Sequence, residues 1–76
     1  GDNYYKTIKS KKLIALLVRN GFVSKLGSKH GKYENESKIV IIIPRHKVLS
    51  PGVSKEICEV LEKQVKIPKE ELKKLF

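Results

Sequence analysis

This 76-residue chain has few residues of the kinds that build disulfides, metal sites or aromatic clusters. It contains one cysteine, three tyrosines and two phenylalanines, and neither methionine nor tryptophan. Cys58 alone cannot form an internal disulfide, and with two separated histidines it matches no zinc-ligand spacing. These absences exclude a disulfide-stapled scaffold and a zinc motif, and they favour a reducing, cytoplasmic location.

Long apolar runs are also missing. The longest covers residues 13–18, whereas a membrane-spanning helix needs about 20 apolar residues. The sequence shows no basic segment followed by an apolar stretch, so we expect no secretory signal. Neither G-x-G-x-x-G nor G-x-x-x-x-G-K-[ST] occurs, which argues against most nucleotide-cofactor enzymes, and we expect no cofactor.

Acidic residues are scarce relative to basic ones. The chain has 17 Lys and Arg against 8 Asp and Glu, a net charge of +9. Residues 1–47 hold 11 basic and 3 acidic side chains, and residues 48–76 hold 6 and 5. A basic first half predicts a polyanionic partner. RNA, DNA and an anionic membrane are the candidates, and the short apolar runs make the membrane the least favoured.

Apolar spacing and turn residues predict an α-β-β-β-α order with a final short helix. The predicted elements are a helix over 10–20, strands over 22–26, 30–34 and 38–43, a helix over 51–65 and a short helix over 68–76. Short strands separated by turns are typical of an antiparallel meander, so we expect an α+β fold with helices against a three-stranded sheet.

Residues 1–76 are expected to form a single domain, with a flexible lead-in over 1–7 and a C-terminal extension over 67–76. Ser10 and Ser50 are suited to cap the two longer helices. The pair Asn20-Gly21 supplies the left-handed residue with which a helix often ends.

The stretch around His30 is the most informative for chemistry. In a strand over 30–34, side chains alternate, so His30 and Lys32 share one face. A neutral imidazole can accept a proton from a ribose 2′-hydroxyl, and lysines can stabilise charge growing on a phosphate. A histidine in a lysine-rich strand is more often only solvated, so composition alone does not favour catalysis.

Four short motifs occur in order along residues 10–65. They are Asn20-Gly21-Phe22, Gly27-Ser28-Lys29-His30, Pro44-Arg45-His46 and Ser50-Pro51-Gly52. Together the motifs resemble those of the HicA family of toxin ribonucleases. The resemblance implies a fold like the double-stranded RNA-binding domain, cleavage of messenger RNA without a metal, and a HicB-type antitoxin that covers the site. It also implies that His30 is the functional histidine and that the 2′-hydroxyl attacks the adjacent phosphate, leaving a cyclic phosphate.

The other candidate substrate-binding residues are basic or polar. They are Lys25, Ser28, Lys29, Lys32, Arg45 and His46. Arg45 can grip a phosphate bidentately, and His46 is either a second proton carrier or a solvated loop residue. Aromatic residues for stacking are few, and no lysine cluster starts the second long helix. We therefore expect salt-sensitive binding of single-stranded rather than duplex RNA.

Two features leave alternatives open. Four lysines crowd the start of the first helix, where the helix dipole disfavours positive charge, so they either contact a polyanion or form a solvated face. The third strand is apolar on both faces. Either the helices or the extension cover its second face, or that face binds an antitoxin or a second copy of the chain. A non-catalytic RNA-binding module and a pure interaction domain remain the alternative functions.

Overall fold

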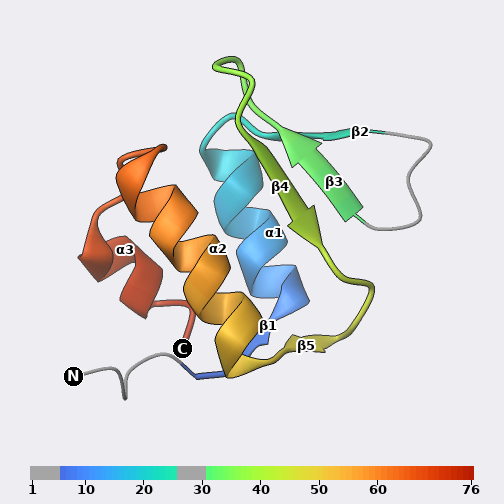
Figure 1. Cartoon of the computed structure of the whole chain (residues 1–76), viewed down its shortest axis with the longest axis vertical. Coiled ribbons are helices and arrows are strands. Elements are labelled where there is room, and N and C mark those ends of the chain that lie inside the picture. The colour runs from blue at the N-terminus through green and yellow to red at the C-terminus, as the bar shows by residue number, and fades with distance from the viewer. Residues whose placement is uncertain (1–5, 26–30) are drawn as a thin grey trace.

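The computed structural model describes residues 6–25 and 31–76, and Figure 1 shows how their elements are arranged. In chain order these are β1 (Ile8–Lys9), α1 (Ser10–Arg19), β2 (Val23–Lys25), β3 (Gly31–Glu34), β4 (Val40–Ile43), β5 (Val48–Leu49), α2 (Pro51–Lys63) and α3 (Lys69–Lys73). The α+β class is confirmed, and each predicted helix and strand is present within a few residues of its expected bounds. The predicted strand bounds 26 and 30 lie outside the described residues.

The three central strands form the predicted antiparallel sheet in the order β2-β3-β4. Its register pairs Ser24 with Tyr33 and Tyr33 with Ile41. Because side chains alternate along a strand, this row faces one side of the sheet and its neighbours face the other. Ile41 and Ile43 are buried, whereas Val40 and Ile42 are exposed. The first side is therefore the inner face, which packs on the helices.

Helices α1 and α2 lie side by side on the inner face of the sheet, and α3 lies beyond α2 (Figure 1). Their apolar stripes form one core. Its buried members are Ile8, Leu13, Leu16, Leu17, Phe22, Ile41, Ile43, Leu49, Ile57, Cys58, Leu61, Ile67, Leu72 and Leu75. The last three belong to the C-terminal extension. Residues 67–76 therefore pack on the domain, a point that the sequence left open.

The two predicted serine caps have different outcomes. Ser50 caps α2, where its Oγ accepts a hydrogen bond from the Val53 main-chain N–H at 3.4 Å. The cap assigned to Ser10 is wrong, because Lys9 occupies the N-cap position of α1 and Ser10 is the first helical residue. At the other end of α1, Gly21 adopts φ +85°, which confirms the predicted left-handed stop.

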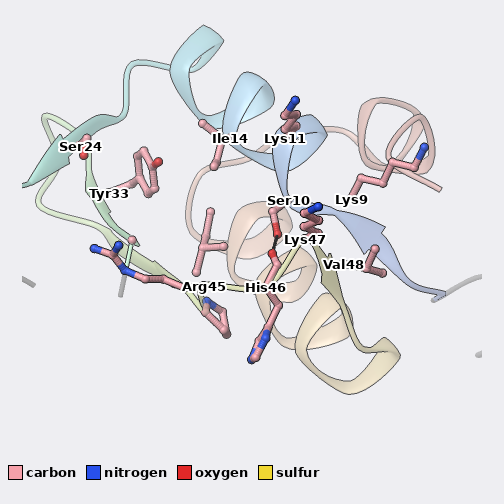
Figure 2. A pocket seen from close by; sticks show the side chains of 13 residues that line it. Lys9, Ser10, Lys11, Ile14, Ser24, Tyr33, Arg45, His46, Lys47 and Val48 are labelled. Carbon is pink, nitrogen blue, oxygen red and sulfur yellow. Dashed lines mark hydrogen bonds between the residues drawn. The ribbon is translucent and has the colours of Figure 1, made fainter. Parts of the chain in front are cut away.

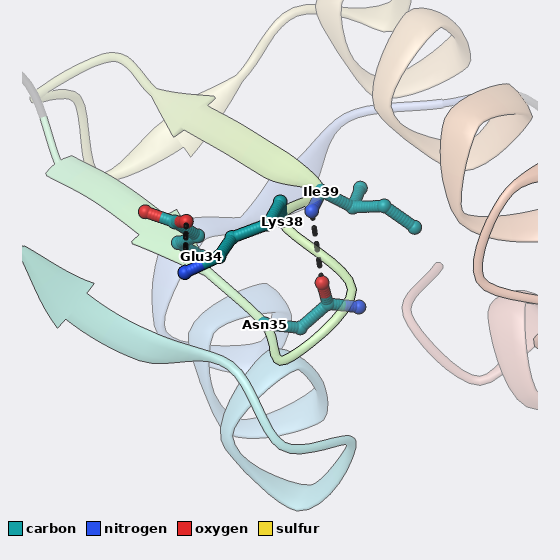
Figure 3. A network of polar contacts seen from close by, with 4 residues as sticks. All are labelled: Glu34, Asn35, Lys38 and Ile39. Carbon is teal, nitrogen blue, oxygen red and sulfur yellow. Dashed lines mark hydrogen bonds and ion pairs between the residues drawn. The ribbon is translucent and has the colours of Figure 1, made fainter.

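Two side-chain contacts span the turn between β3 and β4 (Figure 3). The Asn35 Oδ1 accepts a hydrogen bond from the Ile39 N–H at 2.9 Å. The Lys38 Nζ lies 3.9 Å from the Glu34 Oε2, an exposed pair of little energetic weight. Lys38 itself takes φ +67°. The strand was predicted to start at residue 38, but that residue lies in this turn, and β4 begins at Val40.

A second, two-stranded sheet was not predicted. β1 pairs antiparallel with β5, with Ile8 opposite Leu49 and Lys9 opposite Val48. Ile8 and Leu49 are almost fully buried. Each strand has only two residues, too few for a periodic pattern, and their partners are about forty positions apart. Of the predicted lead-in, Lys6 and Thr7 are exposed and without regular structure, and residues 1–5 lie outside the described part.

The outer face of the sheet is open in the described structure. Val23, Val40 and Ile42 are 55, 40 and 54% exposed. Of the two alternatives for the second face of the third strand, cover by the helices or the extension is therefore wrong, because both lie on the inner side. That this face binds another protein stays a prediction.

Candidate functional site

A hollow of about 880 Å³ opens where the start of α1 meets the segment between β4 and β5 (Figure 2). The inner face of β2 and β3 forms another of its sides. Its lining residues are Lys9, Ser10, Lys11, Ile14, Ser24, Gly31, Tyr33, Ile43, Pro44, Arg45, His46, Lys47 and Val48. The hollow therefore joins segments that are up to about forty positions apart in the chain.

The hollow is strongly basic. Four of its lining side chains are lysine or arginine, one is an imidazole and none is a carboxylate. Figure 2 shows the charged ends of Lys9, Lys11 and Arg45 at separate points around it. The ion pairs of Lys38 with Glu34, Lys69 with Glu62 and Lys74 with Glu71 lie elsewhere on the domain. The positive electrostatic potential of the lining side chains attracts anions.

Ser10 links the start of α1 to the basic segment 44–47 by hydrogen bonds. Its hydroxyl donates a hydrogen bond to the main-chain carbonyl oxygen of His46. Its main-chain N–H donates another to the carbonyl oxygen of Lys47 at 2.9 Å. The side chain is buried, 9% exposed. Within the same segment, the His46 N–H donates to the Pro44 carbonyl oxygen at 2.8 Å. The backbone that carries Arg45 and His46 is thus fixed against the first turn of α1.

Two of the predicted site residues lie in this hollow and two lie on the opposite side of the sheet. Arg45 and His46 line the hollow and are exposed. Lys25 and Lys32 face each other across β2 and β3 on the outer face. Like charges directly opposite in a sheet are destabilising, so this pair also favours an anion nearby.

The remaining predicted residues, Ser28, Lys29 and His30, lie outside the described residues. Their chain neighbours are described, however. Lys25 ends β2, and Gly31, which follows His30 in the sequence, begins β3 and lines the hollow. The segment 26–30 therefore connects two strands whose adjoining ends carry a lysine pair on one face and border the hollow on the other.

The sequence analysis missed several residues of the hollow. One of them is Tyr33, whose half-buried ring packs against the core and also lines the hollow. Lys47 was not singled out, although it continues the basic run Arg45-His46. Lys9 and Lys11 were noted only as part of the lysine cluster at the helix start. The missing information was the β1–β5 pairing, which brings that cluster to the segment 44–47.

Cys58 is separate from the hollow. It is buried on α2, and burial, helped by the negative charge of Glu62, raises the pKa of its thiol to about 11. No group of three histidine, cysteine or acidic side chains in the described ranges is placed to hold a metal ion. The helices of residues 6–25 and 31–76 are also too short or too polar to cross a bilayer.

Comparison with known protein families gives a match over most of the chain. The family model described as HicA toxin of bacterial toxin-antitoxin matches residues 10–67. No curated protein and no solved structure matches the chain. The matched region runs from the first residue of α1 to the start of the C-terminal extension, so it includes the whole three-stranded sheet and both long helices. The order of these elements is consistent with the double-stranded RNA-binding-domain-like fold of that family. The chain belongs to the HicA toxin family, the toxins of bacterial toxin–antitoxin systems.

Proposed function

We propose that this toxin is a metal-independent endoribonuclease that cleaves single-stranded messenger RNA, with His30 as the residue that transfers the proton. The observation that carries the proposal is the basic hollow bordered by Gly31, the chain neighbour of His30. Family membership supports a toxin, and the electrostatic field of the hollow supports a polyanionic substrate.

The chemistry needs no group beyond side chains. His30 takes the proton of a ribose 2′-hydroxyl, whose oxygen attacks the adjacent phosphorus. The bond from phosphorus to the 5′-oxygen breaks, leaving a 2′,3′-cyclic phosphate, and the 5′-oxygen takes up a proton from His46 or from water. A single positioned proton acceptor contributes about 10²–10⁴-fold, so stabilisation of the phosphate by Arg45 and the nearby lysines is also needed.

The two groups of cationic side chains can both contact the phosphates of an RNA strand that passes the end of the sheet. Arg45 and His46 lie in the hollow on the inner side, and Lys25 and Lys32 lie on the outer side. The segment 26–30 lies between Lys25 and Lys32 in the sequence, and we propose Ser28 and Lys29 as further contacts to the phosphates. A flexible single strand can follow such a path more readily than a rigid duplex.

The partner proposed for this toxin is a HicB-like antitoxin. A net charge of +9 favours an acidic partner, and an antitoxin that covers the basic hollow would block access of RNA. The open outer face with Val23, Val40 and Ile42 is the other surface available to a partner, either the antitoxin or a second copy of the chain.

Replacement of His30 tests the catalytic proposal. Purified wild-type toxin is expected to cleave single-stranded RNA in the presence of EDTA, with cyclic-phosphate ends detectable by mass spectrometry. His30→Ala should lose about 10²–10⁴-fold in rate while keeping its circular-dichroism spectrum and RNA affinity. His46→Ala is measured in parallel, since it removes the second imidazole of the chain and tests whether His46 supplies the proton to the 5′-oxygen.

The outcomes separate the candidate functions. If His30→Ala cleaves at the wild-type rate, the catalytic assignment is wrong. If only His46→Ala loses activity, the proton-transferring role belongs to His46. A wild-type protein that binds RNA without cleaving it would be a non-catalytic RNA-binding module, a function that the same basic hollow also supports.

A further inference from the structure

We propose that the hollow is a binding site for a phosphate of the RNA backbone other than the one that is cleaved, held by Lys9, Lys11 and Lys47. This inference rests on the proposed function only for the identity of the substrate. None of the three lysines was among the expected site residues, and each lines the hollow.

The fold brings these three lysines together from two distant segments. Lys9 is in β1 and stands opposite Val48 of β5, so Lys47 directly precedes the paired strand. The Ser10 N–H bonds the Lys47 carbonyl oxygen at 2.9 Å and joins the first turn of α1 to the same segment. Lys11 follows in that turn. Short-range hydrogen bonds thus hold the backbones of all three lysines at fixed relative positions.

Lys9, Lys11 and Lys47 form no ion pair within the described residues. No carboxylate lines the hollow, and the first turn of α1 contains no acidic residue. Lysines in a first helical turn are disfavoured by the helix dipole, and mutual repulsion adds to the cost. A phosphate bound in the hollow by these flexible side chains reduces both penalties, because it is an anion that accepts hydrogen bonds from ammonium groups.

The remaining walls fit the rest of a nucleotide. Ile14, Tyr33 and Ile43 give the hollow an apolar side, and Tyr33 presents an aromatic ring. At about 880 Å³ the hollow is larger than one phosphate group requires. Bases stack on aromatic side chains with little sequence preference. A nucleotide of the single-stranded RNA can therefore place its phosphate at the lysines and its base toward Tyr33.

Substitution of two adjacent lysines in turn can distinguish a defined phosphate site from a diffuse positive field. Lys11 and Lys12 are both exposed residues of the first turn of α1, but only Lys11 lines the hollow. Lys11→Gln and Lys12→Gln remove the same charge from the same turn. The probe is a short single-stranded RNA with 2′-O-methyl groups, which cannot be cleaved by 2′-hydroxyl attack, and the measurement is its affinity for the full chain at several salt concentrations.

The logarithm of the association constant falls linearly with the logarithm of the salt concentration. We expect Lys11→Gln to make this slope less negative by about 0.7, which corresponds to the loss of one phosphate contact to a single strand. Lys47→Gln should do the same, whereas Lys12→Gln should leave the slope close to that of the wild type. Equal effects of Lys11→Gln and Lys12→Gln would overturn the proposal, because a diffuse field does not distinguish them. Thermal unfolding of each variant checks that the fold is intact.

The same measurement is independent of catalysis. If wild-type protein fails to cleave ordinary RNA but Lys11→Gln and Lys12→Gln still differ in binding, the phosphate site stands and the endoribonuclease proposal falls. If cleavage is observed and the two variants bind alike, the phosphate site falls and the endoribonuclease proposal stands.

Discussion

Ser10 donates its side-chain hydrogen bond to the main-chain carbonyl oxygen of His46, 36 positions along the chain. A serine at a helix start commonly caps its own helix, but here the hydroxyl is directed to another segment. Together with the bond from the Ser10 N–H to the Lys47 carbonyl oxygen, it fixes the loop that carries two of the predicted substrate contacts. Ser10 is therefore a positioning residue for Arg45 and His46.

Replacement of Ser10 by alanine should loosen that loop. The His46 carbonyl oxygen loses its side-chain partner, which lowers the free energy of unfolding by about 1 kcal/mol. Because the Arg45 and His46 side chains then sample more positions, KM for RNA should rise while kcat changes less. Steady-state cleavage kinetics and chemical denaturation measure the two effects.

Ser10→Thr is the control for this variant, since threonine keeps the hydroxyl and the same helical position. It should restore most of the wild-type KM. A Ser10→Ala variant with lower stability but unchanged KM would show that the hydrogen bond is structural only.

Two neighbouring isoleucines of β4 should respond very differently to truncation. Ile43 is 3% exposed on the inner face, whereas Ile42 is 54% exposed on the outer face. Ile43→Ala leaves a cavity in the core and should cost about 2–5 kcal/mol of unfolding free energy. Ile42→Ala should cost at most about 1 kcal/mol, mainly through lower strand propensity. Urea denaturation measures both, and similar losses would mean that the outer face is covered in solution.

Replacement of two glycines by alanine should change stability in opposite directions, because only one of them has a positive φ. Gly21 has φ +85° after α1, and Gly52 lies in the first turn of α2, where an added Cβ meets nothing within 4 Å. Gly21→Ala should lower the free energy of unfolding by about 1 kcal/mol because alanine resists positive φ. Gly52→Ala should raise it by about 0.4–1 kcal/mol by restricting the unfolded chain. Thermal denaturation of the two variants should show opposite shifts of Tm.

Local sequence signals predicted most of the elements. The apolar spacing of the two long helices, the Ser50 cap and the Asn20-Gly21 stop depend only on residues within a few positions of one another. The β-branched run of β4 and the turn residues between the strands are also local signals, so the sheet and its order could be predicted. The inner and outer faces of β4 could not be told apart, because both are apolar and only the position of the helices decides which is buried.

The site was only partly predictable, for a related reason. Arg45 and His46 stood out as basic residues beside a strand end, and both line the hollow. The hollow itself depends on the pairing of Ile8 with Leu49, a contact between distant two-residue strands that no local pattern indicates. The same lack of a long-range signal led to the wrong role for Ser10, whose partner lies 36 positions away.

The buried thiol of Cys58 should make stability depend on pH in the alkaline range. In the unfolded chain the thiol ionises with a pKa near its ordinary 9.0, whereas burial, with a further effect from Glu62, raises the pKa in the folded chain to about 11. Between these values the folded protein retains a proton that the unfolded chain has lost. This group's contribution is therefore complete below pH 9 and falls as pH rises, by at most about 1.4 kcal/mol per pH unit. Lysines titrate in the same range, so the measurement is the difference in unfolding free energy between wild type and Cys58→Ala at several pH values. That difference should shrink from pH 9 to pH 11, and a difference independent of pH would show that the thiol ionises equally in both states.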